Sequence, residues 1–230
     1  MNFQLTEEQI AVRTAAREFA QSELLPGVIE RDTHQKFPAE QIKKMGELGF
    51  MGMMVDPKYN GGGMDTISYV LAMEEISKID ASASVCMSVN NSLVCWGLER
   101  FGSEDQKEKY LKRLSTGAVI GAFCLSEPEA GSDATSQHST AEDKGDHYLV
   151  NGTKNWITNG NSAGVYVVIA QTHPEKKHKG INALIVERGM EGFVVGKKED
   201  KMGIRGSDTH SLMFTEIGRA SCRERVYSSV

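Results

Sequence analysis

The stretch "AVIGAFCLSEPEAGSD", residues 118–133, marks the point where the hydrophobic pattern of this chain changes. Its first half is a short apolar run that ends at Leu125 and predicts a β-strand. Pro128 follows soon after and stops a strand ladder, because proline has no N–H to donate. Gly131 and Ser132 then predict an exposed turn. The stretch therefore places a strand and a polar loop directly after a region of a different kind.

Upstream of this stretch the apolar residues recur at helical spacing. A capping box begins a first helix at Thr6, and Pro26 stops it. Further helices are expected from Phe37-Pro38 to about Gly49, from a cap at Asp65 to about Ile79, over residues 82–102, and from a second capping box at Ser103 to about Gly117.

Downstream the apolar runs are short and rich in β-branched residues. They are "AVIGAFCL", "HYLVNG", "NWIT", "VYVVIAQT", "INALIVE", "FVVGKK" and "SLMFT", with polar connections such as "EDKGDH" and "HPEKKHKG". The sequence predicts an α+β protein, with an all-helical domain over residues 1–117 and an antiparallel β domain, barrel-like or a sandwich, over residues 118–215.

The composition excludes several classes of protein. Hydrophobic residues make up 40% and charged residues 25% of the 230 residues, as in globular proteins with a real core. A net charge of −5 disfavours nucleic-acid binding, and no apolar run is long enough for a membrane span. The N-terminus lacks the features of a secretory signal, and the four cysteines lack metal-ligand spacing. We therefore expect a cytoplasmic protein with free thiols and no metal site.

The last residues differ from the rest. From Glu216 the chain reads "EIGRASCRERVYSSV", which has no apolar periodicity and resembles a translated sequencing adapter. We expect residues 216–230 to be an artefactual tail, although Glu216 and Ile217 fit a native continuation of the strand. The preceding 215 residues are then expected to be a fragment.

Two polar stretches are candidates for ligand contact. The loop in "CLSEPEAGSD", residues 124–133, offers backbone N–H groups and hydroxyls that suit a phosphate, although a strand-end turn uses the same residues. In "GTKNWITNG", residues 152–160, Trp156 could face an aromatic ligand beside the Thr158 hydroxyl, or could be a core residue. The residues alone leave both alternatives open.

Three other features carry weaker signals. The loop "YNGGGMD", residues 59–65, lacks the ending of a phosphate-binding loop and is expected to be a mobile connection. The charged run "GKKEDKMGIRGSDT", residues 196–209, is expected to be a solvated hairpin. The six histidines form no catalytic constellation, and His34 and His210 are expected to be surface or core residues.

Taken together and in order, these motifs resemble the acyl-CoA dehydrogenases. "CLSEPEAGSD" resembles their first signature, "GTKNWITNG" their flavin-facing strand, and "KKEDKMGIRGSDT" a hairpin of their middle domain. "MSVNNSL", residues 87–93, and "KKMGELG", residues 43–49, are similar to the short-chain, butyryl-type branch. The resemblance covers residues 1–215 and implies a helical N-terminal domain, a middle β domain and a C-terminal helical bundle that is missing here. Without that bundle, the fragment is expected to be inactive and, because apolar faces are left uncovered, poorly soluble.

The resemblance also implies a cofactor and site residues. FAD would contact a set from both motifs: Phe123, Cys124, Leu125, Ser126, Gly131, Ser132, Trp156, Ile157 and Thr158. Ser126 would lie near the edge of the flavin ring, and the Thr158 hydroxyl would point toward its N5 atom. Ser132 would also contact the acyl-CoA, Met87 and Leu93 would line the acyl pocket, and Thr172 would contact the CoA moiety.

The implied reaction is α,β-dehydrogenation of a short-chain acyl-CoA in fatty-acid β-oxidation. The family's catalytic base is a Glu of the C-terminal domain, so we assign no catalytic residue within these 230 residues. The implied partners are an electron-transferring flavoprotein and further copies of the chain in a homotetramer. Two alternatives are a flavin monooxygenase of the same fold and a truncated, non-catalytic binding protein.

Overall fold

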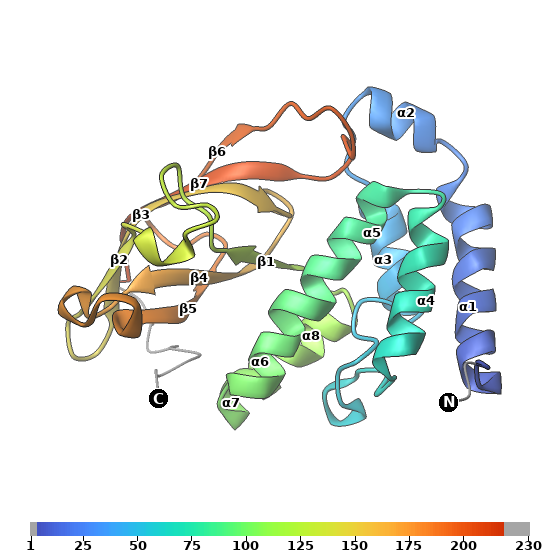
Figure 1. Ribbon diagram of the computed structural model, residues 1–230, viewed down its shortest axis with the longest axis horizontal. Helices are drawn as coiled ribbons and strands as arrows, with labels where there is room; N and C mark the ends of the chain where they lie inside the picture. Colours follow the sequence, from blue (N-terminus) through green and yellow to red (C-terminus); the bar gives the residue numbers. More distant parts are fainter. Residues whose placement is uncertain (1–3, 219–230) are drawn as a thin grey trace. The chain divides into compact units, whose positions relative to one another are not determined.

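The computed structural model describes residues 4–218, which form two compact units (Figure 1). The helical unit comprises the residues up to Trp96 together with Leu111–Ala118 and Asp200–Ser207. The sheet unit comprises Gly97–Tyr110, Val119–Glu199 and the residues from Asp208 onward. The expected fold class is confirmed, because a helical region precedes a curled β-sheet. Most of the expected artefactual tail lies outside the described residues.

The expected helices are present, with their ends where the capping residues place them. The helical segments are α1 (Glu7–Phe19), η1 (Ala20–Leu24), α2 (Val28–Thr33), α3 (Ala39–Glu47), η2 (Pro57–Tyr59), α4 (Thr66–Ser77), α5 (Ala81–Ser88), η3 (Val89–Cys95), α6 (Trp96–Phe101), α7 (Glu104–Gln106), η4 (Lys107–Leu111) and α8 (Lys112–Ser115). Thr6 and Ser103 both form complete capping boxes, and the Asp65 side chain caps α4. Short α2 was not expected, because its six residues are too few to show a period.

The predicted long helix over residues 82–102 is continuous but contains a π-helical segment, η3. Extra residues in a turn rotate the side chains that follow, so neighbouring positions can face the interior together. Asn90 and Asn91 both do so and are buried. The Asn90 amide donates to the carbonyls of Met51 (2.8 Å) and Leu114 (3.1 Å). The π segment therefore fixes the chain around residue 51 to the central helix of this unit.

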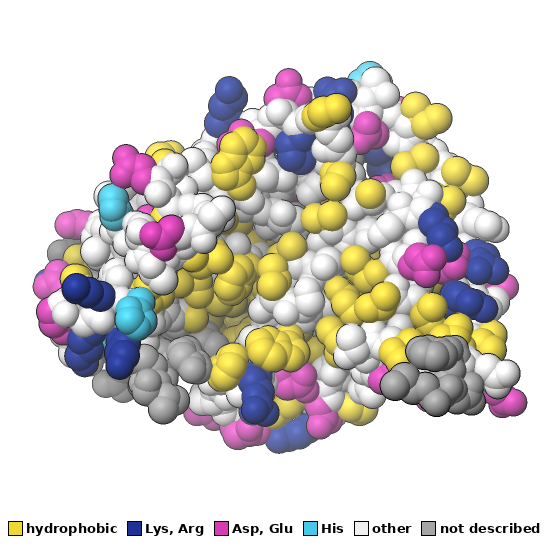
Figure 2. Space-filling view, in the orientation of Figure 1, with side chains coloured by type: hydrophobic (Ala, Val, Ile, Leu, Met, Phe, Trp, Pro, Cys, Tyr) yellow, Lys and Arg dark blue, Asp and Glu magenta, His cyan; other side chains and the backbone are white. Residues whose placement is uncertain are grey.

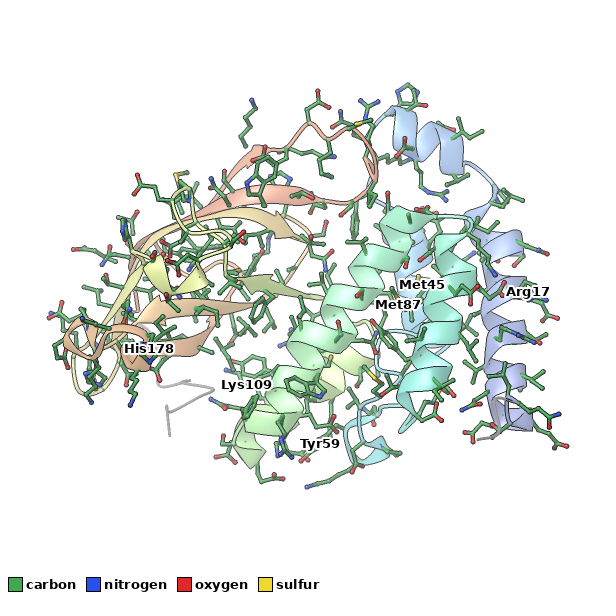
Figure 3. All side chains as sticks on the ribbon, viewed as in Figure 1. Arg17, Met45, Tyr59, Met87, Lys109 and His178 are labelled. Atoms are coloured by element: carbon green, nitrogen blue, oxygen red, sulfur yellow. The ribbon has the colours of Figure 1, made fainter. Side chains whose placement is uncertain are left out.

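The core of the helical unit is rich in methionine. Met45 on α3 and Met87 on α5 are both fully buried and lie in its interior (Figure 3). Met51 and Met53, from the segment after α3, are also fully buried. Methionine suits this place because its flexible side chain fills irregular gaps between helices.

The glycine-rich loop is packed, which differs from the expected mobile connection. Gly62, Gly63 and Met64 donate backbone hydrogen bonds of 2.8–2.9 Å to the carbonyls of Gly52, Val55 and Met53. A Cβ atom on Gly61 would lie 2.1 Å from the Val55 carbonyl oxygen. The glycines therefore allow two backbone segments to approach closely, and this is why the loop is ordered.

A pair of helical glycines gives opposite predictions for stability. In α3, a Cβ on Gly46 would lie 2.3 Å from the Thr116 carbonyl oxygen, whereas Gly97 in α6 has no such neighbour within 4 Å. Gly46→Ala is expected to cost about 1–3 kcal/mol, because backbone must move. Gly97→Ala is expected to stabilise by about 0.5–1 kcal/mol through helix propensity. Urea unfolding followed by circular dichroism checks both, and equal effects of the two substitutions would contradict the packing argument.

A buried carboxylate predicts acid sensitivity of the helical unit. Glu75 on α4 is 5% exposed and accepts two hydrogen bonds from Arg17 on α1, at 2.9 and 3.0 Å (Figure 3). These bonds lower the pKa of Glu75 from 4.5 to about 2. A lowered pKa in the folded state stabilises the fold above the unfolded pKa, and this contribution is lost as the pH falls through the folded value. Wild-type stability should therefore drop between about pH 4.5 and 2.

Glu75→Gln is expected to be less stable than wild type at pH 7 and to lose less stability on acidification. Thermal melting over this pH range measures the difference. The exposed Glu47→Gln variant is the control and should follow the wild-type curve. Parallel curves for wild type and Glu75→Gln would show that the Arg17 pair contributes nothing to the acid response.

The sheet unit contains one seven-stranded sheet with the path β1-β4-β2-β3-β7-β6, and β5 pairs with β4. The strands are β1 (Gly121–Cys124), β2 (Thr140–Asp143), β3 (Tyr148–Thr158), β4 (Val165–Gln171), β5 (Ile181–Glu187), β6 (Phe193–Lys198) and β7 (Thr209–Ile217). Most pairs are antiparallel as expected, but β4 is parallel both to β1 and, at Thr140 opposite Gln171, to β2. Strand β7 continues to Ile217, opposite Val150. The predicted domain limits, 1–117 and 118–215, stay predictions.

The charged connection between β6 and β7 is more than a solvated hairpin. Its tip, Asp200–Ser207, belongs to the helical unit. There the Arg205 backbone N–H donates to Asp32 (2.9 Å), and the Gln35 amide donates to Asp200 (2.8 Å). This run therefore makes specific contacts with the end of α2 and the residues that follow it.

Candidate functional site

The two polar stretches singled out in the sequence lie side by side in the sheet unit. The Asn155 backbone N–H donates to the Ser126 carbonyl at 2.8 Å. The Lys154 ammonium donates to the Leu125 carbonyl at 3.0 Å. The loop after β1 is therefore joined to β3 just before Trp156. The sequence could not show these contacts, because the residues that make them are 29 positions apart.

Trp156 is held in an unusual position. Its side chain is 61% exposed and its φ is +60°, in the left-handed region that a bulky residue rarely adopts. The pairing of β3 with β7 is irregular between Lys154 and Ile157, so Trp156 lies in a bulge. A strained and exposed indole costs free energy and persists only where its surroundings fix it. Trp156 is therefore not a core residue of this unit, and its contact with a flat ligand stays a prediction.

The loop after β1 is closed at its base and open at its tip. Glu127 and Ala130 exchange two backbone hydrogen bonds, of 3.0 and 3.2 Å. Gly131 and Ser132, which follow, are exposed, and the space beside Gly131 is open. Asp133 accepts hydrogen bonds from Thr135 and Ser136, which order the rest of the turn. The tip therefore presents exposed backbone at Gly131 and the Ser132 hydroxyl.

A buried ion pair lies beneath this loop. The Lys154 side chain is fully buried and its Nζ atom lies 2.7 Å from Glu127 Oε1 and 3.1 Å from Gln137 Oε1. Burial lowers the pKa of Lys154, and Glu127 offsets this only in part. Burial alone would raise the pKa of Glu127, but hydrogen bonds from Lys154, Ser139 and His138 outweigh it and lower that pKa below its usual range. The Glu127 carboxylate is therefore ionised near neutral pH, with Lys154 as its buried partner.

The remaining predicted cofactor residues of the first stretch lie on β1. Phe123 is half-buried opposite Val167, and Cys124 is fully buried opposite Val168. Burial strongly raises the pKa of the Cys124 thiol, so no thiolate forms at neutral pH. Cys124 is therefore an inert apolar residue beneath the loop.

The end of β3 is held in place by a buried residue and by hydrogen bonds in the turn that follows it. Ile157 is buried, and Thr158 is half-buried opposite Thr209. In the turn that follows, Asp208 accepts hydrogen bonds from the Asn161 backbone (3.0 Å) and the Ser162 hydroxyl (2.7 Å). This turn holds Thr158 at a fixed place near the bulge.

His210 is a satisfied core residue, as expected. Its Nε2 atom lies 2.8 Å from Asp208, and its Nδ1 atom lies 3.1 Å from the Gly196 carbonyl oxygen. Both ring nitrogens thus have acceptors within the fold. No ring nitrogen is left to act on a substrate.

Thr172 has its hydroxyl engaged inside the fold. The hydroxyl donates to the Gly180 carbonyl at 3.1 Å and accepts a hydrogen bond from Asn182. These bonds shape the turn between β4 and β5, which contains η6 (Pro174–Gly180). Lys and His side chains gather on this turn, His178 among them (Figures 2 and 3). The CoA contact of Thr172 stays a prediction.

The predicted acyl-pocket residues lie in the helical unit. Met87 is fully buried on α5, whereas Leu93 on η3 is 43% exposed. Trp96, one turn further along, is also exposed. Their role in a pocket stays a prediction, as does the second role of Ser132.

Neither a metal centre nor a membrane span is found among residues 4–218. In this part of the chain no three His, Cys, Asp or Glu side chains group so as to hold a metal ion. No helix within it combines the length and the apolar character needed to cross a bilayer.

Sequence reasoning missed Lys154, Glu127 and Gln137. A lysine inside a strand is ordinarily read as a solvent-exposed residue, and a glutamate before proline as part of a turn. The available signal was strand alternation, which places Lys154 on the same face as Trp156 in "GTKNWITNG". Only the fold shows that its partners come from the other motif.

Comparison with known proteins matches this architecture. The family model "Acyl-CoA dehydrogenase, N-terminal domain" matches residues 6–118, and "Acyl-CoA dehydrogenase, middle domain" matches residues 122–217. The chain is 45% identical over 217 residues to the short-chain specific acyl-CoA dehydrogenase of Clostridium acetobutylicum, covering 94% of this chain and 57% of that protein. It therefore spans little more than half the length of this relative.

Two solved structures have the same fold. Butyryl-CoA dehydrogenase from Megasphaera elsdenii has a TM-score of 0.94 and 40% identity, over 100% of this chain and 61% of that one. A glutaryl-CoA dehydrogenase from Mycobacterium smegmatis, solved in complex with FADH2, has a TM-score of 0.91 and 32% identity, over 97% of this chain and 56% of that one. The chain belongs to the acyl-CoA dehydrogenase family, of which it carries the N-terminal and middle domains.

Proposed function

We propose that this chain is part of an FAD-dependent dehydrogenase that oxidises short-chain acyl-CoA thioesters between their α and β carbons. The observation that carries the proposal is the exposed Trp156, strained in a bulge beside the Gly131-Ser132 loop. The family membership and the butyryl-CoA and short-chain relatives support the substrate class.

The residues present fit a flavin. A planar, polar ring system needs an aromatic or apolar wall and hydrogen-bond donors at its edge. Trp156 supplies an exposed aromatic surface, Thr158 supplies a hydroxyl group two residues further along the chain, and Ser126 supplies another from the loop that is bonded to Asn155. Phe123, Leu125, Ile157 and the Gly131-Ser132 tip would complete the set. When bound, the flavin supplies the capacity to accept a hydride.

The chain's own contribution is orientation. Buried Ile157 and Lys154 flank the Trp156 bulge and fix it, and the closed base of the loop fixes Ser126. Met87 and Leu93 would wall the acyl chain, and Ser132 and Thr172 would contact the CoA part. We assign no base to these residues, and place it in the remaining part of the protein. An electron-transferring flavoprotein as acceptor, a homotetramer and a cytoplasmic location complete the proposal.

The test begins with a long read of the source DNA across codon 215. The complete reading frame is then expressed, and its oxidation of butyryl-CoA is measured with an artificial electron acceptor. Formation of the enoyl-CoA with a flavin-containing protein is the expected result. A complete protein that binds no flavin, or a reading frame that truly ends at Val230, would overturn the dehydrogenase proposal.

Trp156→Ala in that complete protein is expected to weaken FAD binding by about 10-fold or more, because stacking on an aromatic ring contributes about 1–3 kcal/mol. Fluorescence titration of the apoprotein with FAD measures the change. Val194→Ala is the matched control, since Val194 is another half-exposed apolar residue of the same sheet. Equal affinities for wild type and Trp156→Ala would remove Trp156 from the cofactor site.

A further inference from the structure

One loop supplies hydrogen-bond acceptors for all three donors of the Lys154 ammonium. Its three hydrogen-bond acceptors are the Leu125 carbonyl (3.0 Å), Glu127 Oε1 (2.7 Å) and Gln137 Oε1 (3.1 Å). An ammonium group has three donors, so none is left for any other partner. The three acceptors come from the start, the base and the far side of the loop over residues 125–137. One side chain from β3 therefore fixes this loop at three points.

Glu127 extends the same network to the end of the loop. Its carboxylate accepts hydrogen bonds from the backbone N–H groups of His138 (2.5 Å) and Ser139 (3.0 Å). The Ser139 carbonyl in turn accepts from the Gln171 backbone of β4 at 2.8 Å. The loop thus leaves the sheet at Leu125 and returns to it at Ser139, with Lys154 and Glu127 closing the ring.

Stability alone does not account for this pair. Removing two charges from water is costly, and apolar side chains of similar volume often serve a core equally well. A lysine differs from an apolar residue because its hydrogen bonds are directional. Each N–H donor requires an acceptor at a defined place, so the three bonds favour one conformation of the loop. The loop whose conformation is selected carries Ser126, Gly131 and Ser132.

Lys154 also stands directly before the strained bulge. The next residue, Asn155, donates its backbone N–H to Ser126, and Trp156 then adopts its positive φ. A positive φ at a bulky residue persists only where the neighbouring chain is held in place. Lys154 before Trp156 and Ile157 after it are both buried and hold the chain there. Displacing Lys154 would therefore release both the loop and the indole.

We propose that Lys154 is a positioning residue, which acts through Glu127 and Gln137 to hold the 125–139 loop and the Trp156 bulge in the arrangement that a flavin requires. The proposal rests on the proposed flavin function. Lys154 itself contacts no ligand in this assignment, because all its donors are used inside the fold. Its expected contribution is pre-organisation of the site.

The test compares Lys154→Met with Lys144→Met. Lys144 lies in the exposed β2–β3 turn of the same unit, where it pairs with Glu142, so both variants lose one lysine charge. Hydrogen exchange of the unliganded chain is measured first. Lys154→Met should raise exchange at the His138 and Ser139 amides at least 10-fold relative to the amides of β5, and Lys144→Met should leave it unchanged.

Flavin binding by the complete protein is the second readout. Lys154→Met should weaken FAD binding at least 10-fold and alter the visible circular dichroism of the flavin at saturation, whereas a purely structural role would lower only the melting temperature. Wild-type loop exchange, affinity and flavin spectrum in a folded Lys154→Met protein would overturn the proposal. Absence of flavin binding by wild type would overturn the proposed function instead, and loop exchange would still decide the role of Lys154.

Should Lys154→Met fail to fold, Glu127→Gln decides the question. Glutamine keeps an oxygen for Lys154 but removes the charge and part of the acceptor capacity for the two loop amides. Exchange at His138 and Ser139 should rise at least 3-fold with a smaller loss of flavin affinity in the same direction. Unchanged exchange and unchanged flavin binding in folded Glu127→Gln would count against the network as a positioning device.

Discussion

Replacing Asp80 with alanine is expected to lower the free energy of unfolding of the helical unit by about 3–5 kcal/mol, the usual cost of removing one partner of a buried ion pair. Asp80 and Arg31 have side chains that are only 5% and 10% exposed, and the closest atoms are 3.0 Å apart. Without Asp80, the guanidinium would keep only its bonds to the Leu24 and Pro26 carbonyls. A buried positive charge would then lack its counter-charge.

Asp80 has a second role that adds to the loss. Its other carboxylate oxygen accepts the backbone N–H groups of Ser82 (3.0 Å) and Ala83 (3.1 Å), and so caps α5. A cap of this kind contributes about 1 kcal/mol. One side chain therefore fixes the start of the central helix and its connection to α2.

The two tryptophans of the chain, Trp96 and Trp156, make the measurement specific. In a Trp156→Phe background, urea unfolding followed by fluorescence reports on Trp96 in the helical unit. Asp65→Ala is the control: Asp65 caps α4, but it is exposed and its side-chain partner is the neutral Gln9. A loss of about 1 kcal/mol is expected there. If Asp80→Ala cost no more than Asp65→Ala, the ion pair would contribute nothing.

The helices could be predicted from local sequence because their ends carry local signals. Thr6 with Gln9, Ser103 with Gln106, and Asp65 with Ser68 are contacts over three residues, and the structure confirms each. The strands were visible as β-branched runs. What local patterns could not show was pairing: the parallel β1–β4 contact depends on which strands meet in space, as Gly121 opposite Val165 shows.

The candidate site was predictable in part for the same reason. The motif residues could be named through the family resemblance, but their spatial relation could not. Lys154 and Glu127 are 27 residues apart, and the hydrogen bond between them appears only in the fold. The strain at Trp156 was also invisible, because a positive φ at tryptophan follows from the bulge and the buried neighbours and not from any propensity of the residue.

Asn91→Leu is the other substitution expected to have a large effect, a loss of about 3–5 kcal/mol in the helical unit. The Asn91 side chain is buried and makes three hydrogen bonds: it accepts from the Met53 backbone N–H (2.8 Å) and donates to the carbonyls of Phe50 (2.9 Å) and Met87 (3.0 Å). Leucine fills a similar space but makes no hydrogen bond to the Met53 N–H and the Phe50 carbonyl, and each buried group left unsatisfied costs about 1–3 kcal/mol.

Asn91→Asp separates this explanation from a simple packing effect. The carboxylate can still accept from Met53, but it has no donor for the two carbonyls and adds a buried charge. Asn91→Asp should therefore be at least as unstable as Asn91→Leu at pH 7, and should recover some stability in acid, where the protonated group can donate one bond. Urea unfolding in the Trp156→Phe background at both pH values measures this.

Ser92→Ala, the next residue on η3, is the control, because the half-buried Ser92 hydroxyl bonds only back to Ser88 in its own helix. A loss below about 1 kcal/mol is expected there. A similarly small loss in Asn91→Leu would show that water replaces the amide. The large loss would instead show that Asn91 supports the backbone of Met87, which is a predicted acyl-pocket residue. The motif "MSVNNSL" would then combine pocket-lining residues with the side chain that holds them in place.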